Sequence, residues 1–300
     1  MSFNMVPIPV INSQTEVDIP EGEIQQFISD QERSIIHNFP DIDYNAPRGF
    51  SDELIVYLYT FYKFCSPVER VHPYIFTPLI VVFLGNVFLS TLIFNYQICK
   101  ETTTICAETL EVLTWGGLSS DLVVTQGWRL ITYGMHHLNF FHIFTNLLTI
   151  VMAGYMMEIK YGCIRIFLIF WISVLGGGIF SWWFYGPNVI TAGASGGAYG
   201  LVFLMFSDII LNWETVKFKW ITLIILSSAP IGLFLDEFIG LNVATWAHIG
   251  AGISSFWVSF LILPNFYYRK YEWILPVVAA VMVSLQFGLL PGLLYWRDTR

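Results

Sequence analysis

Residues 166–185 read IFLIFWISVLGGGIFSWWFY, a run of twenty residues without a charged side chain. At a rise of about 1.5 Å per residue, a helix of this length crosses the roughly 30 Å hydrocarbon core of a bilayer. The composition of the whole chain agrees, since 55% of its residues are hydrophobic and only 12% are charged. This is more apolar surface than one water-soluble core buries, so the run predicts a transmembrane helix.

Six further apolar runs flank this one along the chain. The predicted spans are residues 75–97, 141–157, 195–211, 220–235, 244–263 and 273–294. Seven spans predict an all-α fold, a polytopic membrane helix bundle, because helices satisfy their own backbone hydrogen bonds in lipid.

Lysine and arginine gather in every second loop. The basic positions are Lys63 and Arg70, Lys160 and Arg165, Lys217 and Lys219, and Arg269 and Lys270. Because basic residues near a span are retained on the cytosolic side, we expect a cytosolic N-terminus and a C-terminus on the opposite side.

The chain before the first span is polar. Residues 1–70 hold half of the 22 acidic residues and predict an acidic cytosolic region, followed by a membrane domain over residues 71–300. Apolar residues at helical spacing within 50–64 indicate either a helix on the inner membrane surface or a plain packing helix. The net charge of −8, without clustered Lys and Arg, argues against a nucleic-acid partner.

The loop at residues 98–140 is long for a helical bundle. It contains Trp115, Trp128 and Tyr133, so we expect it to dip into the membrane interface. Cys99 and Cys106 lie in it and either form a disulfide or remain two thiols. The four cysteines show no spacing typical of zinc sites, and we expect no metal.

Three spans carry polar side chains of chemical interest. His142 and Asn146 lie one helical turn apart in the second span, Ser195 opens the fourth within GASGGAYG (193–200), and His248 lies in the sixth within AHIGAG (247–252). An unpartnered polar group in lipid costs about 2.5 kcal/mol or more. Each of these residues alone has an ordinary structural explanation, but their combination indicates function.

Small residues allow the fourth and sixth spans to approach each other. They are Gly196 and Gly200 on one side and Ala247, Ala251 and Ser255 on the other. Such an approach brings Ser195 within reach of His248, and an imidazole activates a serine hydroxyl for nucleophilic attack. His142, Asn146 and the Ser195 N–H then supply donors for the resulting oxyanion. This inventory suffices for acyl transfer without a third catalytic residue that carries a carboxylate, and we expect no metal or cofactor.

Four separated motifs resemble those of the rhomboid family of intramembrane proteases. They are WR (128–129), HLNFFHIFTN (137–146), GASG (193–196) with Tyr199, and AHIG (247–250). The resemblance covers residues 126–263. It implies a rhomboid-like fold with Ser195 as nucleophile, His248 as base, and His142 and Asn146 as oxyanion donors. It also implies supporting roles for Gly193, Tyr199, His137, Arg129, Trp128 and Glu158.

The resemblance implies further properties. The first is an activity, the cleavage of single-pass transmembrane proteins by a serine endopeptidase. The second is an architecture, a core at residues 71–265 with an additional helix at 273–294, as in the secretase type of eukaryotic rhomboids. Resemblance to that type implies a location in the Golgi, plasma membrane or endosomal membrane. Ala251 and Ser255 depart from the family, which commonly has glycine there.

Two alternatives compete with a protease. The first is a rhomboid-like pseudoprotease that binds and traffics membrane clients without cutting them, against which the intact Ser195 and His248 argue. The second is a small transporter or channel that uses intramembrane histidines as a proton relay. Scarce intramembrane carboxylates and the lack of an inverted repeat argue against the second.

Overall fold

The computed structural model describes residues 72–94, 96–98, 105–107, 109–187, 189–213, 216, 219–238, 244–264 and 273–300. Every described residue belongs to one compact unit, Val56–Arg300. The predicted acidic region 1–70, the predicted helix within 50–64 and Cys99 lie outside the described residues. The basic positions Lys217, Arg269 and Lys270 lie outside them too.

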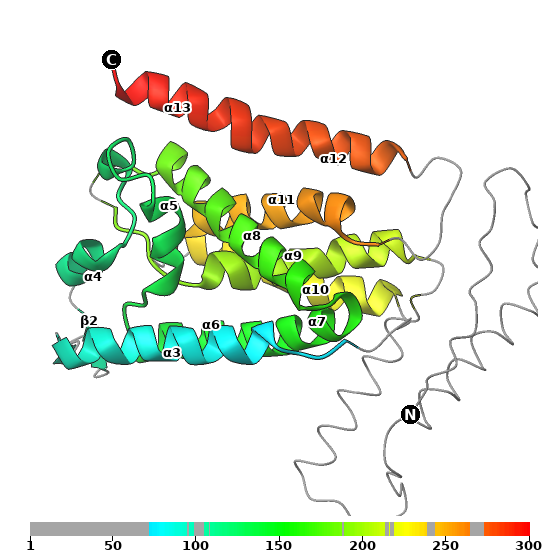
Figure 1. The fold of residues 1–300 in the computed structure, drawn as a ribbon, viewed down its shortest axis with the longest axis horizontal. Helices are drawn as coiled ribbons and strands as arrows, with labels where there is room; N and C mark the ends of the chain where they lie inside the picture. Colours follow the sequence, from blue (N-terminus) through cyan, green and yellow to red (C-terminus); the bar gives the residue numbers. More distant parts are fainter. Residues whose placement is uncertain are drawn as a thin grey trace, which may run out of the picture. The chain divides into compact units, whose positions relative to one another are not determined.

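Long apolar helices make up the described part of the chain (Figure 1). They are α3 (Phe76–Phe94), α6 (Phe140–Thr149) with α7 (Tyr155–Tyr161), α8 (Cys163–Phe184), α9 (Ser195–Leu211), α10 (Lys219–Phe238), α11 (Thr245–Ile262), and α12 (Ile274–Ser284) with α13 (Leu290–Asp298). The π-helical turns η3 (Ile150–Gly154) and η4 (Leu285–Leu289) join α6 to α7 and α12 to α13. These helices match the seven predicted spans, and the predicted membrane helix bundle is confirmed.

Length and apolarity make several of these helices membrane spans. Within the described residues, five helical stretches are long and apolar enough to cross a bilayer, and α9 is a shorter apolar helix of 17 residues. The five are Phe76–Ile93, Phe140–Tyr161, Cys163–Phe184, Thr245–Ile262 and Ile274–Asp298. The chain is therefore an integral, multi-pass membrane protein.

Helices α8, α9 and α11 pack tightly because glycines remove side chains from their contacts. A Cβ atom added at Gly197 would lie 2.2 Å from the Phe170 ring, and one added at Gly200 would lie 2.2 Å from the Ser173 hydroxyl. On the other side of α9, the Ser255 hydroxyl of α11 donates to the Gly200 carbonyl. The small-residue stripes expected on the fourth and sixth spans therefore face each other in the structure.

The segment between α3 and α6 is folded. It contains a short antiparallel pair, β1 (Tyr96–Ile98) and β2 (Ile105–Ala107), which the sequence analysis did not predict. Three short helices follow it: α4 (Thr109–Trp115), η1 (Ser120–Leu122) and α5 (Arg129–Thr132), the last leading into η2 (Tyr133–Met135). Backbone hydrogen bonds between Leu118 and Thr191 tie this segment to the chain that leads into α9.

The expectation that this loop dips into the interface stays a prediction, and Tyr133 differs in burial from the two tryptophans of the loop. Trp115 and Trp128 are about half exposed, whereas Tyr133 is buried and its hydroxyl donates to the Val174 carbonyl of α8 at 2.7 Å. Hydropathy does not distinguish an aromatic ring that meets lipid from one that packs between helices. The hydroxyl group has a protein partner here, as a buried tyrosine requires.

Lys160 is not a free loop charge, although it counted toward the predicted orientation. Its ammonium group is fully buried and lies 2.6 Å from the Asp208 carboxylate near the end of α9. The Tyr161 hydroxyl and the Asn212 amide also donate to that carboxylate. A buried ion pair needs further hydrogen bonds to offset the cost of its burial, and these neighbours supply two to the carboxylate. The network ties α7 to α9.

Candidate active site

Ser195 and His248 come together at one end of the bundle. Ser195 is the first residue of α9 and His248 lies in the first turn of α11. The His248 Nε2 atom lies 2.7 Å from the Ser195 Oγ, and the two residues are 4% and 7% exposed. A neutral imidazole that carries its proton on Nδ1 accepts the serine proton at Nε2. The geometry is that of a nucleophile beside its base.

The turn before α9 is fixed by the loop. Gly193 has a φ of +133°, a conformation that favours glycine. Its N–H donates to the Tyr133 carbonyl at 3.0 Å, and the Ala194 N–H donates to His137 Nε2 at 3.2 Å. These two bonds set the direction in which the chain enters α9, and so the place of the Ser195 hydroxyl.

His142 lies against this turn. A Cβ atom added at Gly193 would lie 2.7 Å from the His142 ring and 3.4 Å from the Ser195 Oγ, so the imidazole and the hydroxyl flank the same small space. The Asn139 side chain caps α6 by accepting from the His142 N–H at 2.9 Å. His142 also packs edge-on against His137, with ring centroids 5.2 Å apart.

Asn146 follows His142 by one turn of α6. It is 6% exposed, and its amide nitrogen has no hydrogen-bond partner among the described residues. Buried polar groups are almost always paired, so an unpaired donor here is available to an oxygen atom of a ligand. The Ser195 N–H at the start of α9 is another available donor, because the first N–H groups of a helix have no intrahelical acceptor.

Tyr199 holds the ring of His248. The two rings stack with centroids 4.4 Å apart and an interplanar angle of 21°. Tyr199 lies one turn after Ser195 on α9, so the same helix carries the serine and a flat surface for the His248 ring. The resemblance implies a supporting role for Tyr199, and this stacking contact is one way to fill it.

Arg129, Trp128 and Glu158 lie away from the Ser195–His248 pair. The buried Arg129 guanidinium donates to the Leu113 and Gly117 carbonyls, and it stacks over the Trp128 ring at 4.6 Å, so it fastens the loop. The Glu158 carboxylate accepts from three backbone N–H groups at the start of α3, those of Ile75, Phe76 and Thr77. It therefore caps α3, as anions do at a helix N-terminus.

The histidines of the loop are kept neutral by burial. Burial, with a smaller contribution from His142 and His136, lowers the pKa of His137 to about 3. Burial also lowers the pKa of His136. A neutral His137 that carries its proton on Nδ1 has an unprotonated Nε2, and this is the tautomer that accepts the Ala194 N–H.

Tyr133 is the residue of this region that the sequence analysis missed. Its carbonyl fixes Gly193, and its hydroxyl lies where side chains at Gly177 and Gly196 would otherwise be, with added Cβ atoms at 2.7 and 2.9 Å. It thus packs between α8 and α9 beside the start of α9, where Ser195 lies. The glycines of both helices were a possible signal, but nothing in the sequence paired them with this tyrosine.

The segment of the chain that contains these residues also resembles known proteins. The family model described as a rhomboid domain matches residues 124–265. RHOMBOID-like protein 4 of Arabidopsis thaliana is 34% identical over 60% of this chain and 45% of its own length. RHOMBOID-like protein 1 of the same plant is 32% identical over 57% of this chain and 44% of its own length. Inactive RHOMBOID-like protein 8, also from Arabidopsis thaliana, is 29% identical over 54% of this chain and 46% of its own length. The chain thus matches less than half the length of each of these three relatives.

Proposed function

Because the chain belongs to the rhomboid family, we propose that it is an intramembrane serine endopeptidase that cleaves the transmembrane segments of single-pass membrane proteins. The observation that carries the proposal is the buried 2.7 Å contact between His248 Nε2 and Ser195 Oγ. The imidazole of His142 lies against the same turn, and the unpaired amide of Asn146 follows it by one turn of α6. These are the groups that acyl transfer requires.

In the proposed reaction Ser195 attacks a substrate peptide carbonyl. His248 Nε2 takes the hydroxyl proton as the Oγ–C bond forms, and the carbonyl oxygen becomes an oxyanion. His142, Asn146 and the Ser195 N–H donate hydrogen bonds to that oxygen. His248 then gives its proton to the leaving amine as the C–N bond breaks. Water, deprotonated by the same imidazole, releases the acyl group and restores Ser195.

The substrate we propose is a helix that unwinds at one end. An intact transmembrane helix engages its carbonyl groups in its own hydrogen bonds and offers none to a nucleophile. Substrates with glycine or proline near the end of their span should therefore be cut fastest, since both residues weaken the helix there. No step of this reaction uses a cofactor. We propose the Golgi, plasma membrane or endosomal membrane as its location, with the N-terminus in the cytosol.

A cleavage assay with matched variants tests the proposal. Wild type in liposomes should cut a reporter transmembrane protein at a defined bond, while Ser195→Ala and His248→Ala should not. Ser207→Ala is the matched control, because Ser207 lies on the same helix and donates to the Phe256 carbonyl of α11 at 2.9 Å. A cut that persists in Ser195→Ala at the wild-type rate contradicts the assignment of the nucleophile.

The second candidate is a pseudoprotease, and the similarity to a relative named as inactive is what favours it. It predicts that wild type and Ser195→Ala bind the same single-pass proteins with equal affinity and that neither cuts them. Finding this across several reporters and lipids would replace the protease proposal.

A further inference from the structure

The last described helix carries one polar side chain into the bundle. Most of α12, η4 and α13 is exposed, yet Gln286 within η4 is only 6% exposed. This helix lies beyond residues 124–265, the part that matches the rhomboid domain. A buried amide in a membrane helix needs partners, so its contacts indicate what the helix is fastened to.

Gln286 bonds to the helix that carries His248. Its Nε2 donates to the Gly250 carbonyl at 3.1 Å and to the Ser254 hydroxyl at 2.7 Å. The Ser254 hydroxyl in turn donates to the same Gly250 carbonyl at 2.7 Å. Gly250 follows His248 by two residues. The amide therefore fastens α11 directly below the turn that presents the imidazole.

Helix α8 makes room for this contact. A Cβ atom added at Gly176 would overlap the Ser254 hydroxyl and lie 3.0 Å from Gln286 Nε2. The π-helical turn also matters, because a π turn changes which faces of a helix point to a neighbour and such turns are frequent at functional sites. Three helices thus meet at one polar point.

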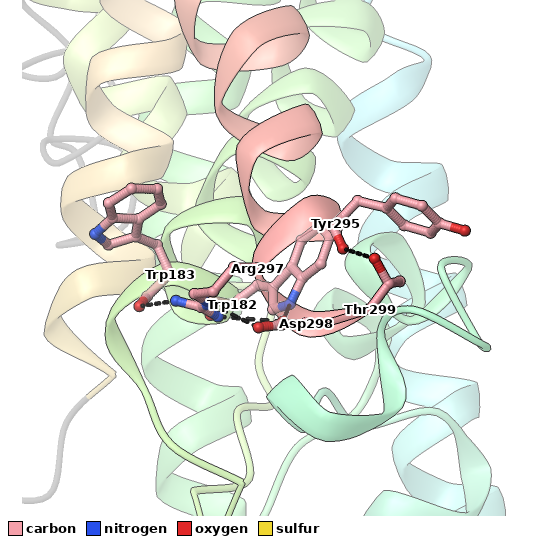
Figure 2. A network of polar contacts seen from close by, with 6 residues as sticks. All are labelled: Trp182, Trp183, Tyr295, Arg297, Asp298 and Thr299. Atoms are coloured by element: carbon pink, nitrogen blue, oxygen red, sulfur yellow. Dashed lines mark hydrogen bonds and ion pairs between the residues drawn. The ribbon is translucent and has the colours of Figure 1, made fainter.

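A second attachment lies at the end of α13 (Figure 2). Arg297 donates to the Trp182 and Trp183 carbonyls at 3.4 and 3.5 Å, and the Asp298 carboxylate accepts from the Trp182 indole at 2.7 Å. The last carbonyls of a helix have no intrahelical donor, and a cation is favoured there. Arg297 and Asp298 therefore bind the C-terminal end of α8.

The end of α8 is itself tied to the start of α11. The Phe184 and Trp246 rings stack with centroids 3.8 Å apart and an interplanar angle of 9°. The Trp246 N–H donates to the Tyr185 hydroxyl at 3.1 Å. Trp246 precedes His248 by two residues. The last helix consequently restrains α11 on both sides of the imidazole, directly at Gly250 and through α8 at Trp246.

We propose that α12–α13 is a brace that holds His248 in place beside Ser195, with Gln286 as its main positioning residue. The effect on cleavage rests on the proposed function. Gln286 acts through Gly250 and Ser254, so it is expected to change the rate of the chemical step and not the binding of substrate.

The test compares the full chain with Gln286→Met, which keeps the length of the side chain and removes the amide. Ser284→Ala is the control, because Ser284 lies on the same helix and bonds only its own backbone, at the Ala280 carbonyl. We expect Gln286→Met to lower kcat by up to about 100-fold with KM unchanged, since a misplacement of about 1 Å in a catalytic group can have an effect of this size. It should also speed hydrogen–deuterium exchange in residues 245–254. Ser284→Ala should match wild type in both.

A double-mutant cycle separates positioning from simple loss of stability. Ser254→Ala should lower kcat as well, and the double variant should be no slower than the slower single one, because both remove the same contact. The brace would be overturned if the effects of the two substitutions on kcat multiplied in the double variant. It would also be overturned if the unfolded fraction at the assay temperature fully accounted for the fall in kcat. If wild type has no activity at all, the proposed function fails and exchange decides the brace: faster exchange near His248 in Gln286→Met supports it, and unchanged exchange overturns it.

Discussion

Two separate requirements exclude a side chain at Gly193. Its φ of +133° disfavours any other residue, and an added Cβ atom would lie 2.7 Å from the His142 ring. We expect Gly193→Ala to destabilise the protein by about 1–3 kcal/mol and to abolish most cleavage. Gly186→Ala is the control in the same loop, because nothing lies within 4 Å of its added Cβ atom. Equal activity of the two variants in the cleavage assay would contradict this account of the turn.

The role proposed for His142 and Asn146 of α6 leads to a kinetic prediction. His142→Ala and Asn146→Ala should each lower kcat by roughly 100-fold with little change in KM, because they stabilise charge that exists only in the transition state. Thr149→Ala serves as the control, since Thr149 is partly exposed on the same helix and bonds the Thr145 carbonyl. Variants that raise KM and leave kcat intact would assign these residues to substrate binding instead.

The buried His137 predicts a dependence of stability on pH. Its folded-state pKa is lowered to about 3, whereas an unfolded histidine has a pKa of about 6.5. The unfolded chain therefore binds the proton more readily, and the stabilisation present above pH 6.5 is lost as the pH falls toward 3. Thermal unfolding of His137→Asn across this window should show a shallower decline than that of wild type. Parallel declines would contradict the assignment.

At the scale of elements, the start of α3 depends on a side chain from another helix. Glu158 accepts from three backbone N–H groups at residues 75–77, where α3 begins, and from the Thr77 hydroxyl at 2.6 Å. Glu158→Gln removes the charge and should lower the free energy of unfolding by about 1–3 kcal/mol, because charge-assisted bonds are lost in a buried site. Glu111→Gln, in the loop helix α4, is the control for the loss of an acidic charge. The measurement is thermal unfolding in detergent, and equal stability of the two variants would contradict the cap.

The helices could be predicted from the sequence because apolar length alone specifies a membrane span. The meeting of Ser195 with His248 followed from small residues on both helices, which the structure shows in contact. The placement of Lys160, Tyr133 and Gln286 could not be predicted. Each buries a polar group against a partner far along the chain, and neither hydropathy nor helical period identifies that partner.

At the scale of the whole molecule, the orientation in the membrane stays a prediction. Burial of Lys160 beside Asp208 removes one loop charge from the argument, but the remaining basic positions still fall in alternate loops. In sealed vesicles that keep the cytosolic face outward, protease should remove a tag placed before residue 72 and spare one placed after Arg300. Removal of the second tag alone would contradict the predicted orientation and indicate the opposite one.

The measurement that tests the central claim most directly is covalent capture of Ser195. A fluorophosphonate reacts with a serine hydroxyl only when a neighbouring base activates it. Peptide mass spectrometry of the labelled full chain should place the adduct on Ser195 in wild type and in Ser207→Ala, and find none there in His248→Ala. An unlabelled Ser195 in folded wild-type protein, or equal labelling in His248→Ala, would contradict the assignment of this pair as the nucleophile and its base.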